Sequence, residues 1–156
     1  MRLFTRCLLL TIVALGTVFG QNASKRSLVA NLTNKVVADG CGCYFKFRGT
    51  PQNVERYVFY SSIDDDKTAW MNVGGRDVKL MLEKETGLKG KEEERVGSRS
   101  RALYALGNIS VSGTYVVTRV CDPNDESCES TQYDVSLVVK KGSKSQVVKA
   151  VGGCGC

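Results

Sequence analysis

Two Cys-Gly-Cys stretches, Cys41-Gly42-Cys43 and Cys154-Gly155-Cys156, frame the patterned part of this 156-residue chain. Because residues two apart in a strand point to the same side, each stretch presents both of its sulfurs to one face. A bond within one stretch would close a strained ring, since extended positions i and i+2 lie near the limit of disulfide reach. We therefore predict two bonds between the stretches, joining the first strand to the last. The spacing leaves open whether Cys41 meets Cys154 or Cys156.

A third pair, Cys121 and Cys128, flanks the turn-rich loop Asp122 to Ser127 and is placed to close that loop. The remaining cysteine, Cys7, lies in a segment that we expect to be removed, which leaves six of the seven cysteines. An even number of cysteines in an exported chain indicates disulfides.

Residues 1–20 have the pattern of a signal peptide. Arg2 and Arg6 precede the apolar stretch Leu8 to Gly16, and the small residues Val18 and Gly20 suit cleavage before Gln21. The apolar stretch is shorter than the roughly 20 residues that span a bilayer. We therefore expect a secreted or periplasmic protein with no integral membrane span after cleavage. Residues 21–39 would form a flexible N-terminal segment, in which a short helix from Ser27 is compatible with the spacing of the apolar residues.

From residue 40 onward the apolar residues recur with period two, which is typical of strands with one buried side. The sequence predicts a single β domain over residues 40–156, with a Gly74-Gly75 hairpin turn, a bulge or bend at Gly113, and Trp70 as the largest core side chain. Strands are predicted over residues 43–48, 56–63, 68–73, 76–83, 102–106, 109–121, 132–140 and 144–151. The fold class is therefore all-β, an antiparallel sandwich or barrel of about eight strands.

The composition argues against several function classes. Without Arg2 and Arg6 the 22 basic residues become 20, against 16 acidic residues, so the mature chain carries a net charge of +4. This charge is dispersed rather than gathered in a basic stripe, so nucleic acid is not an expected partner, whereas an unknown protein or a cell-envelope polymer is. The chain has no His and no nucleophile-elbow, phosphate-loop or dinucleotide motif, so we predict a non-catalytic binding or structural module without a cofactor.

The principal alternative is a metal-binding or thiol-redox protein that uses Cys41, Cys43, Cys154 and Cys156. Zinc sites more often separate paired cysteines by two to four residues, which favours structural disulfides. Oxygen ligands for Ca²⁺ are offered by an aspartate cluster, Asp64, Asp65, Asp66 and Asp77. Because Lys67 and Arg76 lie within that cluster, we interpret it as a solvated turn.

Two loops are candidates for partner recognition, namely Thr86 to Arg101, which is rich in charged residues, and Asp122 to Ser127. Presentation of either loop to an extracellular hydrolase, as an inhibitor, is a third functional option. Asn22, Asn31 and Asn108 each begin an Asn-x-Ser/Thr acceptor, which would matter in a eukaryotic secretory pathway.

Several segments of the chain resemble those of a group of exported proteins. Asp39 to Cys43, Ala69-Trp70-Met71-Asn72, Gly75-Arg76-Asp77-Val78, Cys121 to Cys128 and the closing Cys-Gly-Cys look like those of small exported bacterial proteins of uncharacterised function. The resemblance covers most of the mature chain. It carries no known activity, so no site residue is transferred from it.

Overall fold

The computed structural model of the chain describes residues 27–33, 41–62, 65, 67–87, 95–122, 124 and 128–155. The regular secondary structure of these residues consists of strands. They are β1 (Val29–Ala30), β2 (Gly42–Phe47), β3 (Phe59–Ser62), β4 (Thr68–Val73), β5 (Asp77–Thr86), β6 (Arg99–Leu106), β7 (Ile109–Arg119), β8 (Ser130–Lys141) and β9 (Lys144–Gly155).

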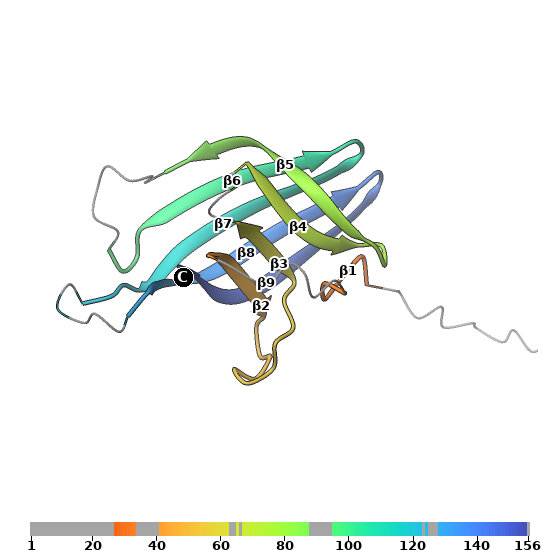
Figure 1. Cartoon of the computed structure of the whole chain (residues 1–156). Coiled ribbons are helices and arrows are strands. Elements are labelled where there is room, and N and C mark those ends of the chain that lie inside the picture. The colour runs from red at the N-terminus through yellow and green to blue at the C-terminus, as the bar shows by residue number, and fades with distance from the viewer. Residues whose placement is uncertain are drawn as a thin grey trace, which may run out of the picture.

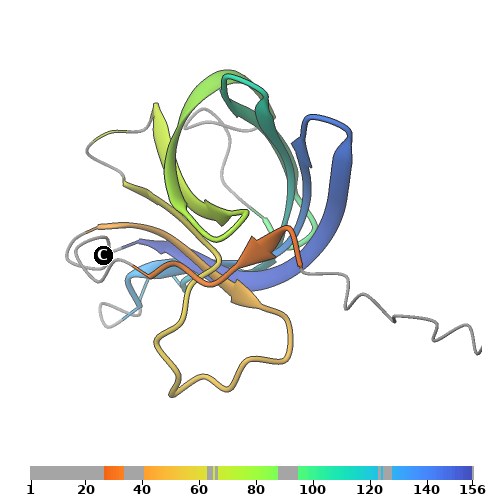
Figure 2. The same ribbon diagram turned by 90° about the vertical axis from the view of Figure 1, so that its right-hand side faces the viewer.

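Eight of these strands close into an up-and-down antiparallel barrel (Figure 1). Each strand from β2 to β8 pairs with the strand that follows it, and β9 pairs with β2. Figure 2 looks into the barrel and shows the ring of strands. The prediction of an antiparallel sandwich or barrel of about eight strands is confirmed, and the form adopted is the barrel. Closure pairs β2 with β3 on one side and β9 on the other, and it pairs residues 150–155 of β9 with both β8 and β2.

The barrel interior is filled by the apolar side chains of the period-two pattern. On β8, Val135, Leu137 and Val139 are buried, whereas Ser136 and Val138 between them are only partly buried. The same alternation supplies the rest of a continuous core, which includes Phe45, Phe59, Met71, Leu80, Val111 and Val148. Alternation along each strand therefore separates the interior from the outer face.

The helix considered from Ser27 is not formed, because this segment is tied to the sheet. Val29 and Ala30 form β1 and pair with Val73 and Asn72 of β4. The side-chain oxygen of Gln146 accepts hydrogen bonds from the backbone N–H groups of Leu28 (2.7 Å) and Val29 (3.2 Å). The segment thus lies across one end of the barrel, between β4 and β9 (Figure 2), and the sheet hydrogen bonds override its helical spacing.

The loop predicted from Thr86 to Arg101 is strand at both ends. Thr86 pairs with Arg101, and Arg99 pairs with Val116, so β5 runs farther and β6 begins earlier than the apolar pattern indicated. Strand pairing is made by backbone N–H and C=O groups. Charged residues can therefore extend β5 and β6 where a neighbouring strand is present to pair with them. Residues 88–94 lie outside the described part of the chain.

Gly113 does not form the predicted bulge. It pairs in regular register with Ala102 and Leu137, and the register shifts of β7 and β5 occur instead at Val117/Arg119 and Leu82/Lys84. A Cβ added at Gly113 would lie 2.7 Å from the ring of Tyr115 on the same strand. The glycine therefore provides room for this ring.

Trp70 is not a core residue, which corrects the prediction made for the single tryptophan. Its strand neighbours Ala69 and Met71 are fully buried, so alternation directs Trp70 to the outer face, where it is half-buried opposite Tyr60. The largest fully buried side chains of the described chain are Phe45 and Phe59. The phase of the alternation, rather than side-chain size, determines which residue lies inside.

Disulfides hold the barrel closed. Cys43 of β2 and Cys154 of β9 are directly opposed in the strand ladder and bonded, with a sequence separation of 111 residues. Cys121 and Cys128 are bonded as predicted and close the β7–β8 connection. Cys41 is also disulfide-bonded, and since Cys154 bonds Cys43, Cys154 is not its partner. The other predicted partner, Cys156, lies outside the described residues.

The predicted signal peptide and its cleavage point also lie outside the described residues. In the part of the chain that the structure describes, no helix is long and apolar enough to cross a membrane.

Candidate ligand-binding groove

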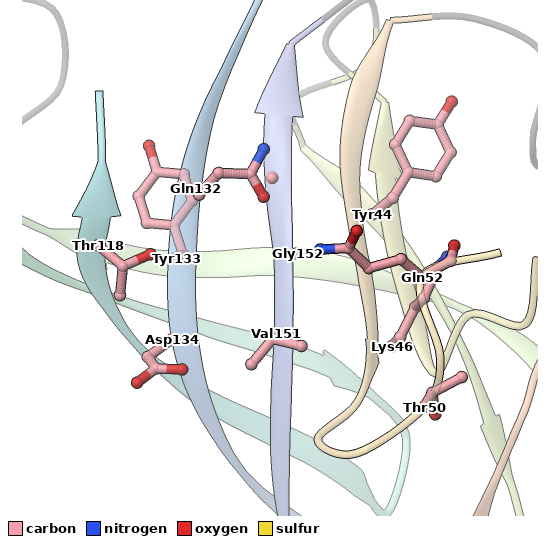
Figure 3. A pocket seen from close by; sticks show the side chains of 11 residues that line it. Tyr44, Lys46, Thr50, Gln52, Thr118, Gln132, Tyr133, Asp134, Val151 and Gly152 are labelled. Atoms are coloured by element: carbon pink, nitrogen blue, oxygen red, sulfur yellow. The ribbon is translucent and has the colours of Figure 1, made fainter. Parts of the chain in front are cut away.

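A hollow of about 380 Å³ lies on the outer face of the barrel, where β9 passes between β2 and β8. Figure 3 shows Thr118, Gln132 and Asp134 on one side of β9 and Tyr44, Lys46 and Gln52 on the other. The full lining is Tyr44, Lys46, Thr50, Gln52, Thr118, Gln132, Tyr133, Asp134, Val151, Gly152 and Gly153. We call this hollow the β9 groove.

Two consecutive glycines make the floor of the β9 groove. A Cβ at Gly153 would lie 2.6 Å from the side-chain nitrogen of Gln132, in the space that now forms the hollow. A Cβ at Gly152 would overlap the carbonyl oxygen of Tyr44, so this glycine allows the β2 backbone to approach closely. On the outer face, the groove is open because β9 carries no side chain at Gly153, which pairs with Tyr44 and Gln132.

The first wall is formed by β2 and by the loop of residues 48–57 that follows it. The ammonium group of Lys46 donates a hydrogen bond to the backbone oxygen of Gln52 (2.8 Å) and lies 5.4 Å from the ring centroid of Tyr57. The N–H of Thr50 donates to the oxygen of Phe47 (3.0 Å). These contacts hold the projecting loop against its own strand, so Thr50 and Gln52 have defined positions beside the groove.

The second wall is formed by β8 and the end of β7. The amide nitrogen of Gln132 donates a hydrogen bond to the hydroxyl of Ser130 (2.8 Å), which orients the amide. Asp134 forms an ion pair with Arg48 at 2.7 Å. Because Arg48 follows β2 and Asp134 lies on β8, this ion pair bridges the two walls across β9.

Tyr44 is supported by an aromatic cluster. Its ring centroid lies 4.8 Å from that of Tyr60 and 5.2 Å from that of Tyr57. Partial burial and the nearby carboxylate of Glu55 raise the pKa of Tyr57. Packing from two other rings restricts the rotation of Tyr44, which lies on the β2 side of the groove.

The aspartates of the proposed Ca²⁺ cluster have other partners. Asp65 accepts hydrogen bonds from the hydroxyl of Thr68 (2.8 Å) and the ammonium of Lys79 (3.2 Å), which lower the pKa of its carboxyl group. Asp77 accepts bonds from Thr33 (2.7 Å) and from the side chain of Asn72 (2.7 Å). Asp64 and Asp66 lie outside the described residues. Among the residues described, no three His, Cys, Asp or Glu side chains converge as metal ligands.

The other sequence-predicted sites are only partly described. In the Asp122 to Ser127 loop, the Asp122 carboxylate accepts a hydrogen bond from the N–H of Asn124 (2.9 Å), which shapes the turn. The other four residues of that loop lie outside the described part. Of the predicted glycosylation acceptors, Asn108 is exposed in the β6–β7 turn, the side-chain oxygen of Asn31 is buried, and Asn22 is not described.

Sequence reasoning did not identify the β9 groove. The alternation correctly places Tyr44 and Lys46 on one face of a strand, and Gly152-Gly153 stands out within an otherwise regular strand pattern. These two signals become a site only when β9 is placed between β2 and β8. Comparison with family models, with curated proteins and with solved structures found no match.

Proposed function

We propose that the protein is an exported, non-catalytic binding module whose ligand occupies the β9 groove. The observation that carries this proposal is the glycine floor at residues 152–153, bounded on both sides by hydrogen-bonding side chains and by the rigid ring of Tyr44. Disulfides of this kind persist in oxidising compartments, which agrees with export.

The charged groups of the groove support binding rather than hydrolysis. Glycoside hydrolysis ordinarily uses two carboxyl groups that face each other across the scissile bond. The described lining of the groove includes one carboxylate, Asp134, and it is paired with Arg48. A single, ion-paired carboxylate suits a structural bridge between the walls better than acid–base chemistry.

The proposal is tested by filling the groove. Thr118 is exposed at the groove, and Ser112 is exposed on the same strand and the same face, roughly 20 Å away for six residues of strand rise. Thr118→Trp should abolish co-sedimentation of the purified domain with cell envelopes of the producing organism. Ser112→Trp, the matched control, should leave co-sedimentation unchanged.

Both variants should unfold at the temperature of the unmodified protein, because both positions are exposed. Equal co-sedimentation of Thr118→Trp and Ser112→Trp would refute the groove as the binding site.

The alternative functions stay predictions. Use of Cys43 and Cys154 for metal or redox chemistry requires reduction of the bond between them, and thiol counting with metal analysis distinguishes this alternative from the binding module. The hydrolase-inhibitor option depends on loops that lie largely outside the described residues. Its test is inhibition of purified extracellular hydrolases by the intact protein.

A further inference from the structure

We propose, building on the function just proposed, that the ligand of the β9 groove is a neutral polysaccharide. A sugar ring would pack on Tyr44, and its hydroxyl groups would bond to the side chains of both walls.

Both charged side chains of the groove already have contacts within the protein. Its described lining includes two charged side chains, Lys46 and Asp134. Lys46 bonds the oxygen of Gln52 and lies near the ring of Tyr57, and Asp134 pairs with Arg48 at 2.7 Å. A charged ligand would compete with these contacts for Lys46, Arg48 or Asp134, whereas a neutral ligand leaves them intact.

The other polar groups suit a ligand rich in hydroxyls. Gln52 and Gln132 present side-chain amides, each of which can donate and accept, and Thr50 and Thr118 present hydroxyls with the same double capacity. Sugar hydroxyls also donate and accept, so each of these side chains can bond to a sugar hydroxyl either as donor or as acceptor. The face of an aromatic ring is electronegative, and it attracts the weakly positive C–H groups on the flat side of a sugar ring.

Strand pairing disfavours a peptide in this groove. Extended peptides commonly bind by adding a strand to an exposed sheet edge. β9 is paired along its length with β8 on one side and over residues 150–155 with β2 on the other. No main-chain edge is therefore offered at the floor of the groove, and recognition must depend on side chains.

The test is isothermal titration calorimetry of the mature protein with soluble polysaccharides. The neutral probes are laminarin, xyloglucan, galactomannan and chitohexaose, and the anionic probe is polygalacturonate. We expect at least one neutral probe to bind with an affinity that is unchanged between low and high salt. Weak binding of polygalacturonate, if it arises from the net positive charge, should disappear at high salt.

Variants assign the binding to the groove. Gln52→Ala and Gln132→Ala should each weaken binding of that neutral probe roughly two- to tenfold, the value of one or two hydrogen bonds. Tyr44→Ala should weaken it by more than about tenfold. Ser112→Ala is the control. Because Tyr44 packs against two other tyrosines, the Gln52 variant decides the result if Tyr44→Ala does not fold.

The outcomes separate this inference from the proposed function. If no neutral probe binds but Thr118→Trp still abolishes envelope co-sedimentation, the polysaccharide inference is wrong and the groove remains a binding site. If polygalacturonate alone binds, and its binding persists at high salt, the ligand is anionic and the inference is again wrong. If a neutral probe binds equally to the protein and to all groove variants, the assignment to the groove is wrong.

Discussion

The disulfide between Cys43 and Cys154 should contribute more stability than the bond between Cys121 and Cys128. The first spans a sequence separation of 111 residues and the second a separation of 7. A crosslink acts largely by restricting the unfolded chain, and its effect grows with the logarithm of loop length. This relation gives about 4.7 kcal/mol for a loop of roughly 100 residues and about 2.4 kcal/mol for the short loop.

Cys41 complicates the measurement because it too is disulfide-bonded. If its partner is Cys156, the one of its two predicted partners that is not bonded to Cys43, a second crosslink already joins the ends of the barrel and hides most of the effect of the first. The comparison is therefore made in a background in which Cys41 and Cys156 are replaced by Ser. There, Cys43→Ser/Cys154→Ser should cost about 2 kcal/mol more than Cys121→Ser/Cys128→Ser.

The assay is urea unfolding followed by the fluorescence of Trp70, which is the single tryptophan and is half-buried on the outer face. With native Cys41 and Cys156, removal of the Cys43–Cys154 bond should cost far less than in the double-Ser background. Equal losses for the two cysteine pairs in the double-Ser background would refute the loop-length reasoning, and so would a larger loss for the short loop.

Three further perturbations test other parts of the fold. Gly152→Ala should destabilise the barrel by about 1–3 kcal/mol in urea unfolding, because its Cβ would overlap the oxygen of Tyr44; a stability equal to that of Ser112→Ala would contradict this. Burial, with Tyr104 and Glu85 nearby, raises the pKa of Tyr115 well above its ordinary value near 10. The folded protein therefore holds this proton longer than the unfolded chain, so the contribution of Tyr115 is complete below about pH 10 and is lost as the pH rises further. Tyr115→Phe should reduce the fall in melting temperature above about pH 10, and an unchanged fall would exclude Tyr115 as its cause. Gln146→Ala should speed amide hydrogen exchange at Leu28 and Val29, because it removes the oxygen that accepts their hydrogen bonds, whereas Gln146→Glu should retain the protection. Equal protection in the unmodified protein and both variants would show that this acceptor is unimportant.

The sequence alone was sufficient for the approximate positions of the eight barrel strands and for the Cys121–Cys128 bond, and it left two possible partners for Cys43. Period-two alternation is a local property, so the predicted strand at residues 68–73 coincides with β4, and the Gly74-Gly75 turn follows it as expected. The Cys43–Cys154 bond was within the two predicted connectivities because the cysteines stand at the two ends of the patterned region. Both inferences use spacing along the chain, which the sequence contains in full.

Tertiary structure decided which face each side chain occupies and where a ligand can bind. Alternation defines two faces but not which one is inside, so only the pairing of β3, β4 and β5 places Trp70 outward, with Ala69 and Met71 inside. Likewise, Gly152, Gln132 and Tyr44 become neighbours only because β9 pairs with β8 on one side and closes against β2 on the other. Closure is a long-range event whose partners are selected by how the whole set of strands packs around a shared core, and no local pattern records that choice.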